Sequence, residues 1–462
     1  MGEFAKSLIS LPWAMSAFGV QQVANLFTSA KEPTRKTEES FYAVTQAAER
    51  QFNDLIWATF QVGDEVQRDM VDFMFDMLTL KAFTPSYLSR LGSDVVRQST
   101  EAARVMMPGN NRLARQQLKN NYEVYNLVKH VHDLLNIPSD GEFPLAELVQ
   151  KAYDLGPYPD LWAVEGLGHD YADSVRRGGK PIRNILTSEN ARVLPAKSLT
   201  MLHAGIGLSF AQHLLETVTP YSPESKIRDM LREFITLCDE NSQKGYVGAA
   251  YESLGLVTRT LHAQMVPVVD KQLSEIAPEV LGYFWHGAGR ALYFLPIYIV
   301  PGMLSPWRAI DREPPHDVGR LNARAGLAWA TALVNIRQPQ IMENVVRYHG
   351  DQLSENDAFS NGVSSSLIMS WDITPGEVYI TDFCQYQPDP SDQHLVELWN
   401  RLVKGPAENA VQRYHRVLQQ YNRLEEVFHY QNLAELVDRL EKEPQQSASL
   451  AVSKLQGAAS PR

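Results

Sequence analysis

Six short glycine-centred boxes recur along the middle of the chain. Each box opens with a glycine in an apolar stretch and carries a small residue two positions later. The opening glycines are Gly166, Gly205, Gly248, Gly287, Gly326 and Gly362. By subtraction they lie 39, 43, 39, 39 and 36 residues apart. A period of roughly 20–50 residues is typical of stacked supersecondary units that bury their apolar faces against their neighbours. The spacing therefore predicts a repeat architecture.

The boxes lie inside apolar stretches of helical character and do not follow strands. An interval of this length can hold two helices and two turns. Glycine inside a helix costs about 1 kcal/mol relative to alanine, so its recurrence needs a reason, and close approach of two helix backbones supplies one. We expect an all-α fold in which residues 141–390 form about six α-hairpins. The period leaves open whether they form an open superhelix or a closed α/α ring.

The regions on either side of the array are also predicted to be largely helical. Residues 1–35 are apolar-biased, and they could lie on a membrane interface or pack on the protein's own core. Residues 36–140 predict a three-helix bundle whose long, Gln-rich helices resemble phasins, the proteins that coat polyester granules. Residues 391–443 predict charged amphipathic helices, and residues 444–462 a disordered tail.

Charge and cysteine content exclude several classes of protein. A net charge of −11 argues against nucleic acid as the main partner, because no basic stripe is present to neutralise phosphates. Cys238 and Cys384 are the two cysteines, so the chain has neither a disulfide framework nor a thiolate zinc site. This favours a cytoplasmic location. No uninterrupted apolar stretch reaches the roughly 18–20 residues of a membrane span.

The order of the boxes resembles a bacterial family of enediyne-biosynthesis proteins, a domain found beside polyketide gene clusters. The segments that carry the resemblance are Glu165-Gly166, His203-Ala-Gly205-Ile-Gly207, Gly245-Tyr-Val-Gly248 and Gly287-Ala-Gly289-Arg290-Ala-Leu292-Tyr293-Phe294. It covers about residues 145–294 and continues more weakly to Trp371. The chain departs from the family after Gly248, where Ala249-Ala250-Tyr251 replaces a Gly-Phe-His pattern. The resemblance implies a place in secondary metabolism.

The residues that follow the opening glycines indicate which side chains could form a functional site. Positions three and four after each glycine lie on the face of the glycine itself. The third positions are His169, Leu208, Tyr251, Arg290, Trp329 and Ser365, and the fourth are Asp170, Ser209, Glu252, Ala291, Ala330 and Ser366. If equivalent helices line one surface, their ionisable side chains converge there.

We interpret three of these residues, together with the residues that precede Gly166 and Gly287, as a candidate acid–base site of five side chains. His169 and His286 would transfer protons, while Glu165, Glu252 and Arg290 would orient groups or stabilise charge. The competing interpretation is a polar ladder that ties adjacent repeats together, with Glu252 and Arg290 as one of its pairs.

A second set is interpreted as lining for an apolar ligand, with core packing as the alternative. Its members are His203, Tyr251, Phe284, Trp285 and Tyr293. No metal or cofactor site is predicted, because the chain lacks a third glycine for a dinucleotide fingerprint, a Walker loop and paired cysteines. Glu426 and His429 form a Glu-x-x-His pair on a predicted charged helix, whereas a di-iron bundle needs two such helical pairs.

These features lead to three functional hypotheses. The first is an accessory protein of polyketide or lipid-like secondary metabolism that binds an apolar acyl or polyene intermediate, or a partner synthase. The second is an enzyme that performs acid–base chemistry on such an intermediate. The third is a phasin-like protein that contacts a granule or membrane surface through residues 1–30. Homo-oligomers are compatible with each of these, and the sequence leaves open whether the protein is an enzyme.

Overall fold

The computed structural model describes residues 108–137, 143–179, 181–295, 298–299 and 305–442. The chain divides into two compact units, one of residues 1–119 with 295–304 and one of residues 120–294 with 305–462. The second unit holds most of the described residues and both sets of predicted site residues. The apolar segment 1–35, most of the predicted bundle and the predicted tail 444–462 lie outside the described residues.

The described residues are helical and contain no strand, which confirms the all-α prediction. In chain order the α-helices are α7 (Pro108–Lys129), α8 (Val131–Leu134), α9 (Leu145–Tyr153), α10 (Pro159–Arg177), α11 (Ala196–Leu215), α12 (Glu224–Asn241), α13 (Val247–Leu261), α14 (Val266–Ile276), α15 (Leu281–Phe294), α16 (Pro306–Arg312), α17 (Asp317–Val334), α18 (Pro339–Leu353), α19 (Ala358–Ile373), α20 (Val378–Gln385), α21 (Gln393–Trp399), α22 (Gly405–Asn409) and α23 (His415–Gln420). A 3-10 turn, Leu424–Phe428, follows α23, and residues 433–442 form a last helix. No helix among these is both long and apolar enough to cross a membrane.

Several helices begin where the sequence supplies a chemical start signal. Proline occupies the first turn of α10, α14, α16 and α18, where an N–H would lack an intrahelical partner. Helix α17 begins differently, because the ring Nδ1 of His316 accepts a hydrogen bond from the backbone N–H of Gly319. The starts are thus fixed locally, and packing decides where each helix lies.

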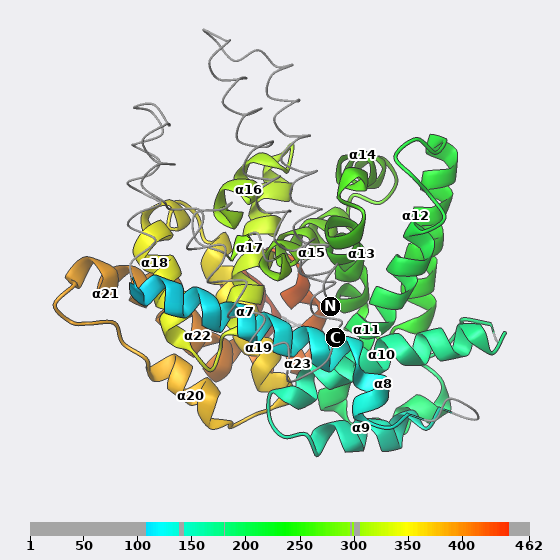
Figure 1. The fold of residues 1–462 in the computed structure, drawn as a ribbon, viewed down its shortest axis with the longest axis horizontal. Coiled ribbons are helices and arrows are strands. Elements are labelled where there is room, and N and C mark those ends of the chain that lie inside the picture. The colour runs from blue at the N-terminus through cyan, green and yellow to red at the C-terminus, as the bar shows by residue number, and fades with distance from the viewer. Residues whose placement is uncertain (1–107, 138–142, 180, 296–297, 300–304, 443–462) are drawn as a thin grey trace, which may run out of the picture. The chain divides into compact units, whose positions relative to one another are not determined.

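The six boxes lie on α10, α11, α13, α15, α17 and α19. These helices pack directly against one another in chain order. Helices α12, α14, α16 and α18 connect the last five of them along the chain and lie farther out in Figure 1. Thr200 of α11 donates a hydrogen bond to Asp372 of α19 at 3.2 Å, so an early and a late boxed helix also meet. The intervening helices range from 7 to 18 residues. The prediction that six equivalent α-hairpins form the array therefore stays a prediction.

Glycine brings the boxed helices into backbone contact. A Cβ at Gly287 would overlap the carbonyl oxygen of Glu252 on α13, and one at Gly326 would overlap that of His286 on α15. Gly205 and Gly362 contact the preceding boxed helix in the same manner. The prediction of close backbone approach is confirmed at these positions.

Two opening glycines have different neighbours. Gly166 faces the carbonyl oxygen of Val128 on α7, and Gly248 faces the ring of Tyr283 and the backbone of Glu425. A Cβ at Gly166 would therefore collide with α7. A Cβ at Gly248 would collide with α15 and with the region after α23. The C-terminal residues thus take part in the packing of the array.

Replacement of Gly287 by alanine should destabilise the protein, because the added methyl group has only the fixed backbone of α13 to displace. Overpacking of this kind costs about 1–3 kcal/mol of the free energy of unfolding. Gly178→Ala is the matched control, since Gly178 is exposed and a Cβ there would be 3.4 Å from its nearest neighbour. Its effect should stay within about 0.5 kcal/mol. Urea denaturation of both variants measures the difference, and equal midpoints would contradict the packing argument.

Candidate functional site

Arg290 lies at the centre of a buried ionic network built by three boxed helices. From α15 its Nη2 donates to Oε1 of Glu165 on α10 at 2.8 Å, and its Nη1 donates to Oε2 of Glu252 on α13 at 2.9 Å. The side chains are 3%, 2% and 0% exposed, respectively. One guanidinium thus links helices that are far apart in the sequence.

His286 lies one turn before Arg290 and completes the network. Its Nδ1 lies 2.7 Å from Oε1 of Glu252, and its side chain is 0% exposed. Burial opposes ionisation of Glu252, but Arg290 and His286 outweigh it and lower the pKa of the carboxyl group. Burial lowers the pKa of the imidazole, and Glu252 offsets this only in part. A neutral imidazole beside an ionised carboxylate must donate through Nδ1, which leaves the lone pair of Nε2 free.

Three buried nitrogen atoms at this site have no hydrogen-bond partner among the described residues. They are Nε2 of His286, Nε of Arg290 and Nε1 of Trp329. The indole ring of Trp329, on α17, lies 4.7 Å from the guanidinium carbon of Arg290 and 6.2 Å from the ring of His286. Buried polar atoms are normally satisfied, so such a group of unsatisfied atoms needs an explanation.

The network also carries an unbalanced charge. Two carboxylates face one guanidinium, and the imidazole is neutral, so one negative charge remains among side chains that are at most 3% exposed. Burial lowers the pKa of Arg290, but Glu165 and Glu252 outweigh it and raise that pKa, so the guanidinium stays charged. A proton taken up at His286 would bring the network to neutrality.

His169 is placed apart from these residues. It is on α10, one turn after Glu165, but its ring is 19% exposed and its nitrogens face Asp170 at 3.5 Å and Gln212 at 3.3 Å. Of the five predicted acid–base residues, the structure therefore brings together four and leaves His169 nearer the surface.

The predicted ligand-lining residues are committed to internal contacts. The His203 ring donates from Nδ1 to the carbonyl oxygen of Leu199 at 2.6 Å, and its Nε2 accepts from the backbone N–H of Gln243 at 2.9 Å. Burial lowers the pKa of His203 to about 4. The hydroxyl of Tyr251 donates to Asp239.

The aromatic members of that set pack in the core. Phe284, Trp285 and Tyr293 are almost fully buried. The indole N–H of Trp285 donates to Asp270 at 2.7 Å, and the hydroxyl of Tyr293 donates to Asn335 at 3.1 Å. Their contacts are those of core residues, as the alternative interpretation of core packing expects.

Trp329 is the functional candidate that sequence reasoning did not select, although its position contains the signal. It occupies the third position after its opening glycine, the position of Arg290 in the preceding box. The sequence analysis expects ionisable side chains to converge, and an indole is not ionisable. Within the described part of the chain no three His, Cys, Asp or Glu side chains are grouped to hold a metal ion.

Comparison of the chain with protein-family models, curated proteins and solved structures gives no match. The resemblance to the enediyne-associated family therefore stays a prediction from the sequence.

Replacement of Arg290 by methionine should strongly destabilise the protein, because two carboxylates would remain buried without a cation. Breaking such a pair costs about 3–5 kcal/mol. Arg413→Met is the matched control, since Arg413 also bridges two carboxylates, Asp438 and Glu441, but is 39% exposed. Its loss should cost about 0–1 kcal/mol. Chemical denaturation at neutral pH compares the two, and a small effect at Arg290 would contradict the burial of the network.

Proposed function

We propose that the helical domain is an enzyme that catalyses proton transfer, with His286 as the general base. The observation that carries the proposal is the state of its ring. Nδ1 is held by Glu252, while Nε2 is buried and has no hydrogen-bond partner in the described part of the chain. A base must present a free lone pair to the proton that it removes. A histidine with a purely structural role would have both nitrogens engaged, as His203 does.

The charge of the network supports this role. When Nε2 takes a proton, the imidazolium forms beside the ionised Glu252 and cancels the single negative charge of the network. Preorganised charge of this kind stabilises the charge that develops during a reaction. Glu252 thus acts as a positioning residue that fixes the tautomer, and Arg290 holds Glu252 in place.

The neighbouring donors indicate a class of substrate. Nε of Arg290 and Nε1 of Trp329 each carry an N–H without a partner among the described residues, and either can donate to an oxygen. An uncharged compound with a carbonyl oxygen beside an acidic C–H would fit these groups. His286 would remove the proton from carbon, the electron pair would move toward the oxygen, and return of the proton at another carbon would give an isomer.

A conjugated acyl or polyene intermediate belongs to this class. Trp329 and Phe428 supply apolar surroundings, and their ring centroids are 6.2 Å apart. The expected carrier role rested on Phe284, Trp285 and Tyr293, which pack in the core, so the geometry favours a catalyst over a carrier. Contact with a synthase, a granule or a second copy stays a prediction.

Solvent deuterium provides the test, because an enzyme of this kind exchanges a carbon-bound proton of its substrate with water. Incubation of the protein with a small-molecule extract of the producing cell in D2O should deuterate at least one metabolite, detected by mass spectrometry. His286→Gln should lower the rate at least about 100-fold. His169→Gln is the control and should keep the rate within about twofold, since His169 contacts Asp170 and Gln212 instead. Equal rates for His286→Gln and wild type, or no deuterated metabolite at all, would contradict the proposal.

A further inference from the structure

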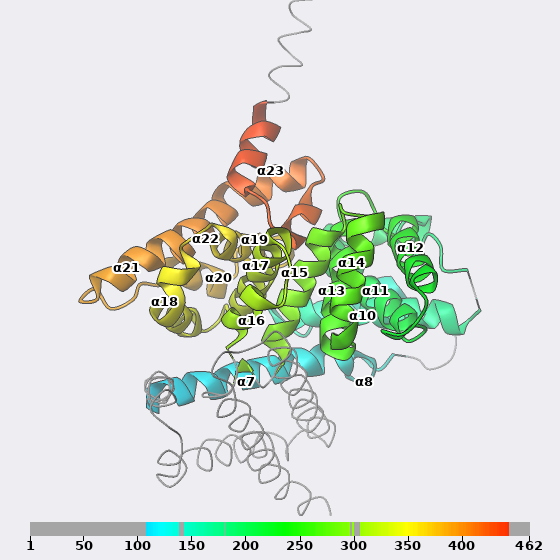
Figure 2. The same cartoon turned by 90° about the horizontal axis from the view of Figure 1, so that it is seen from above.

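Residues 423–431, here named the strap, cross the N-terminal parts of four boxed helices. The backbone N–H of Glu425 donates to the carbonyl oxygen of Gly245, just before α13, at 2.9 Å. The backbone N–H of Tyr430 donates to Oδ1 of Asn322 on α17 at 2.6 Å. Nδ2 of Asn361 on α19 donates to the carbonyl oxygen of Gln431 at 2.5 Å. The strap follows α23, which lies in the upper part of Figure 2.

The strap also packs on the side chains around His286. The ring of Phe428 lies 6.2 Å from that of Trp329, which itself contacts His286 and Arg290. The Cβ of His429 lies 3.5 Å from the position that a Cβ would take at Gly282. Gly282 is four residues before His286 on α15, and residues with this spacing share a helix face. Phe428 is fully buried, so the strap covers this side of the site.

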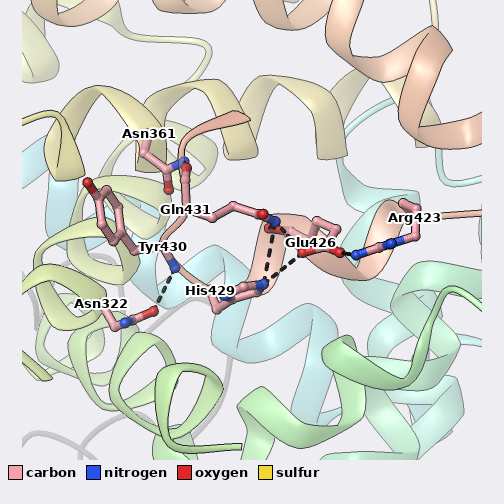
Figure 3. Close-up of polar contacts among 7 residues, drawn as sticks. All are labelled: Asn322, Asn361, Arg423, Glu426, His429, Tyr430 and Gln431. Atoms are coloured by element: carbon pink, nitrogen blue, oxygen red, sulfur yellow. Dashed lines mark hydrogen bonds and ion pairs between the residues drawn. The ribbon is translucent and has the colours of Figure 1, made fainter. Parts of the chain in front are cut away.

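A single buried carboxylate ties the strap together. Glu426 accepts hydrogen bonds from Arg423 and Gln431, and its Oε2 lies 2.9 Å from Nε2 of His429 (Figure 3). These three partners belong to the strap itself. The residue before it, Asn422, has a left-handed backbone with φ of 53° and contacts Gly245. The strap is thus internally bonded. It is joined to the helices by polar contacts and by the buried side chains of Leu424, Val427 and Phe428.

We propose that the strap is the gate to the His286 site, and that Glu426 is its latch. The closed strap leaves His286 0% exposed, so a substrate can reach Nε2 only after some covering element moves. The strap covers one side of the site without a regular α-helix, since it consists of a 3-10 turn and extended residues. In this account the gate opens to admit substrate and closes to exclude water, which rests on the proposed catalytic function.

A disulfide across the strap tests the gate directly. The distance of 3.5 Å between the Cβ positions of residues 282 and 429 fits the Cβ separation of natural disulfides. The Gly282→Cys, His429→Cys double variant can therefore be locked by oxidation and released by reduction. The readout is exchange of the imidazole C2 proton of His286 in D2O, measured by mass spectrometry of the tryptic peptide 272–290, in which His286 is the only histidine.

Exchange at His286 should be at least about tenfold slower in the oxidised than in the reduced double variant. The single variant Gly282→Cys should show no such dependence on oxidation. Equal rates in the locked and released forms would overturn the gate. This exchange requires no catalysis, so it can show gating even if His286→Gln retains the deuteration of metabolites, and the two proposals fail separately.

A second variant covers the case in which the double variant does not fold. Glu426→Gln removes the charge of the latch but keeps an amide of similar shape, and it should raise the exchange rate at His286 several-fold over wild type. Glu435→Gln is its control, because Glu435 is exposed on the following helix. No increase with Glu426→Gln would count against the latch.

Discussion

Helices α13 and α15 approach so closely that the carbonyl oxygen of Glu252 takes the space that a side chain would need at Gly287. This contact sets the relative positions of Glu252, His286 and Arg290 in the buried network. It brings the Glu252 side chain beside the ring of His286 and within reach of Arg290. From α15 the guanidinium extends to Glu165 on α10, so a contact between two backbones is converted into a link among three helices.

A buried ionic network stabilises helix packing inefficiently, because its charges lose their hydration. Transfer of two carboxylates and a guanidinium out of water costs free energy that their attraction only partly returns, and apolar residues of similar size often do as well. A structural ladder explains the pairs between Arg290 and the two glutamates. It does not explain an imidazole with a free Nε2, or an excess negative charge beside it. These two features favour a site in which His286 takes up a proton.

The part of this site that follows the glycine period can be predicted from the sequence. The contacts between residues far apart in the chain cannot. In two boxes an ionisable residue precedes the opening glycine and another follows it by three positions, as Glu165 and His169 on α10 and as His286 and Arg290 on α15. Such pairs share a helix face, which is why both were predicted to belong to the site. On α15 both side chains enter the network, but on α10 the outer turn is near the surface and His169 turns to Asp170 and Gln212.

Residue type alone could not separate binding residues from core residues. His203 looks like a ligand residue until its two nitrogens are seen to bond the backbone of Leu199 and Gln243. The covering strap is harder still to foresee, because it packs on helices that precede it by about 60–180 residues and carries no periodic signal. A glutamate in a charged C-terminal region is usually solvated, yet Glu426 is buried.

The tautomer and charge of His286 are the central claim, and ¹⁵N NMR of histidine-labelled protein measures both directly. We expect one imidazole, absent from the His286→Gln spectrum, that is neutral at pH 7 to 8 with its proton on Nδ1 and a bare Nε2. Protonation of both nitrogens near neutral pH, or a proton on Nε2 with a bare Nδ1, would contradict the claim.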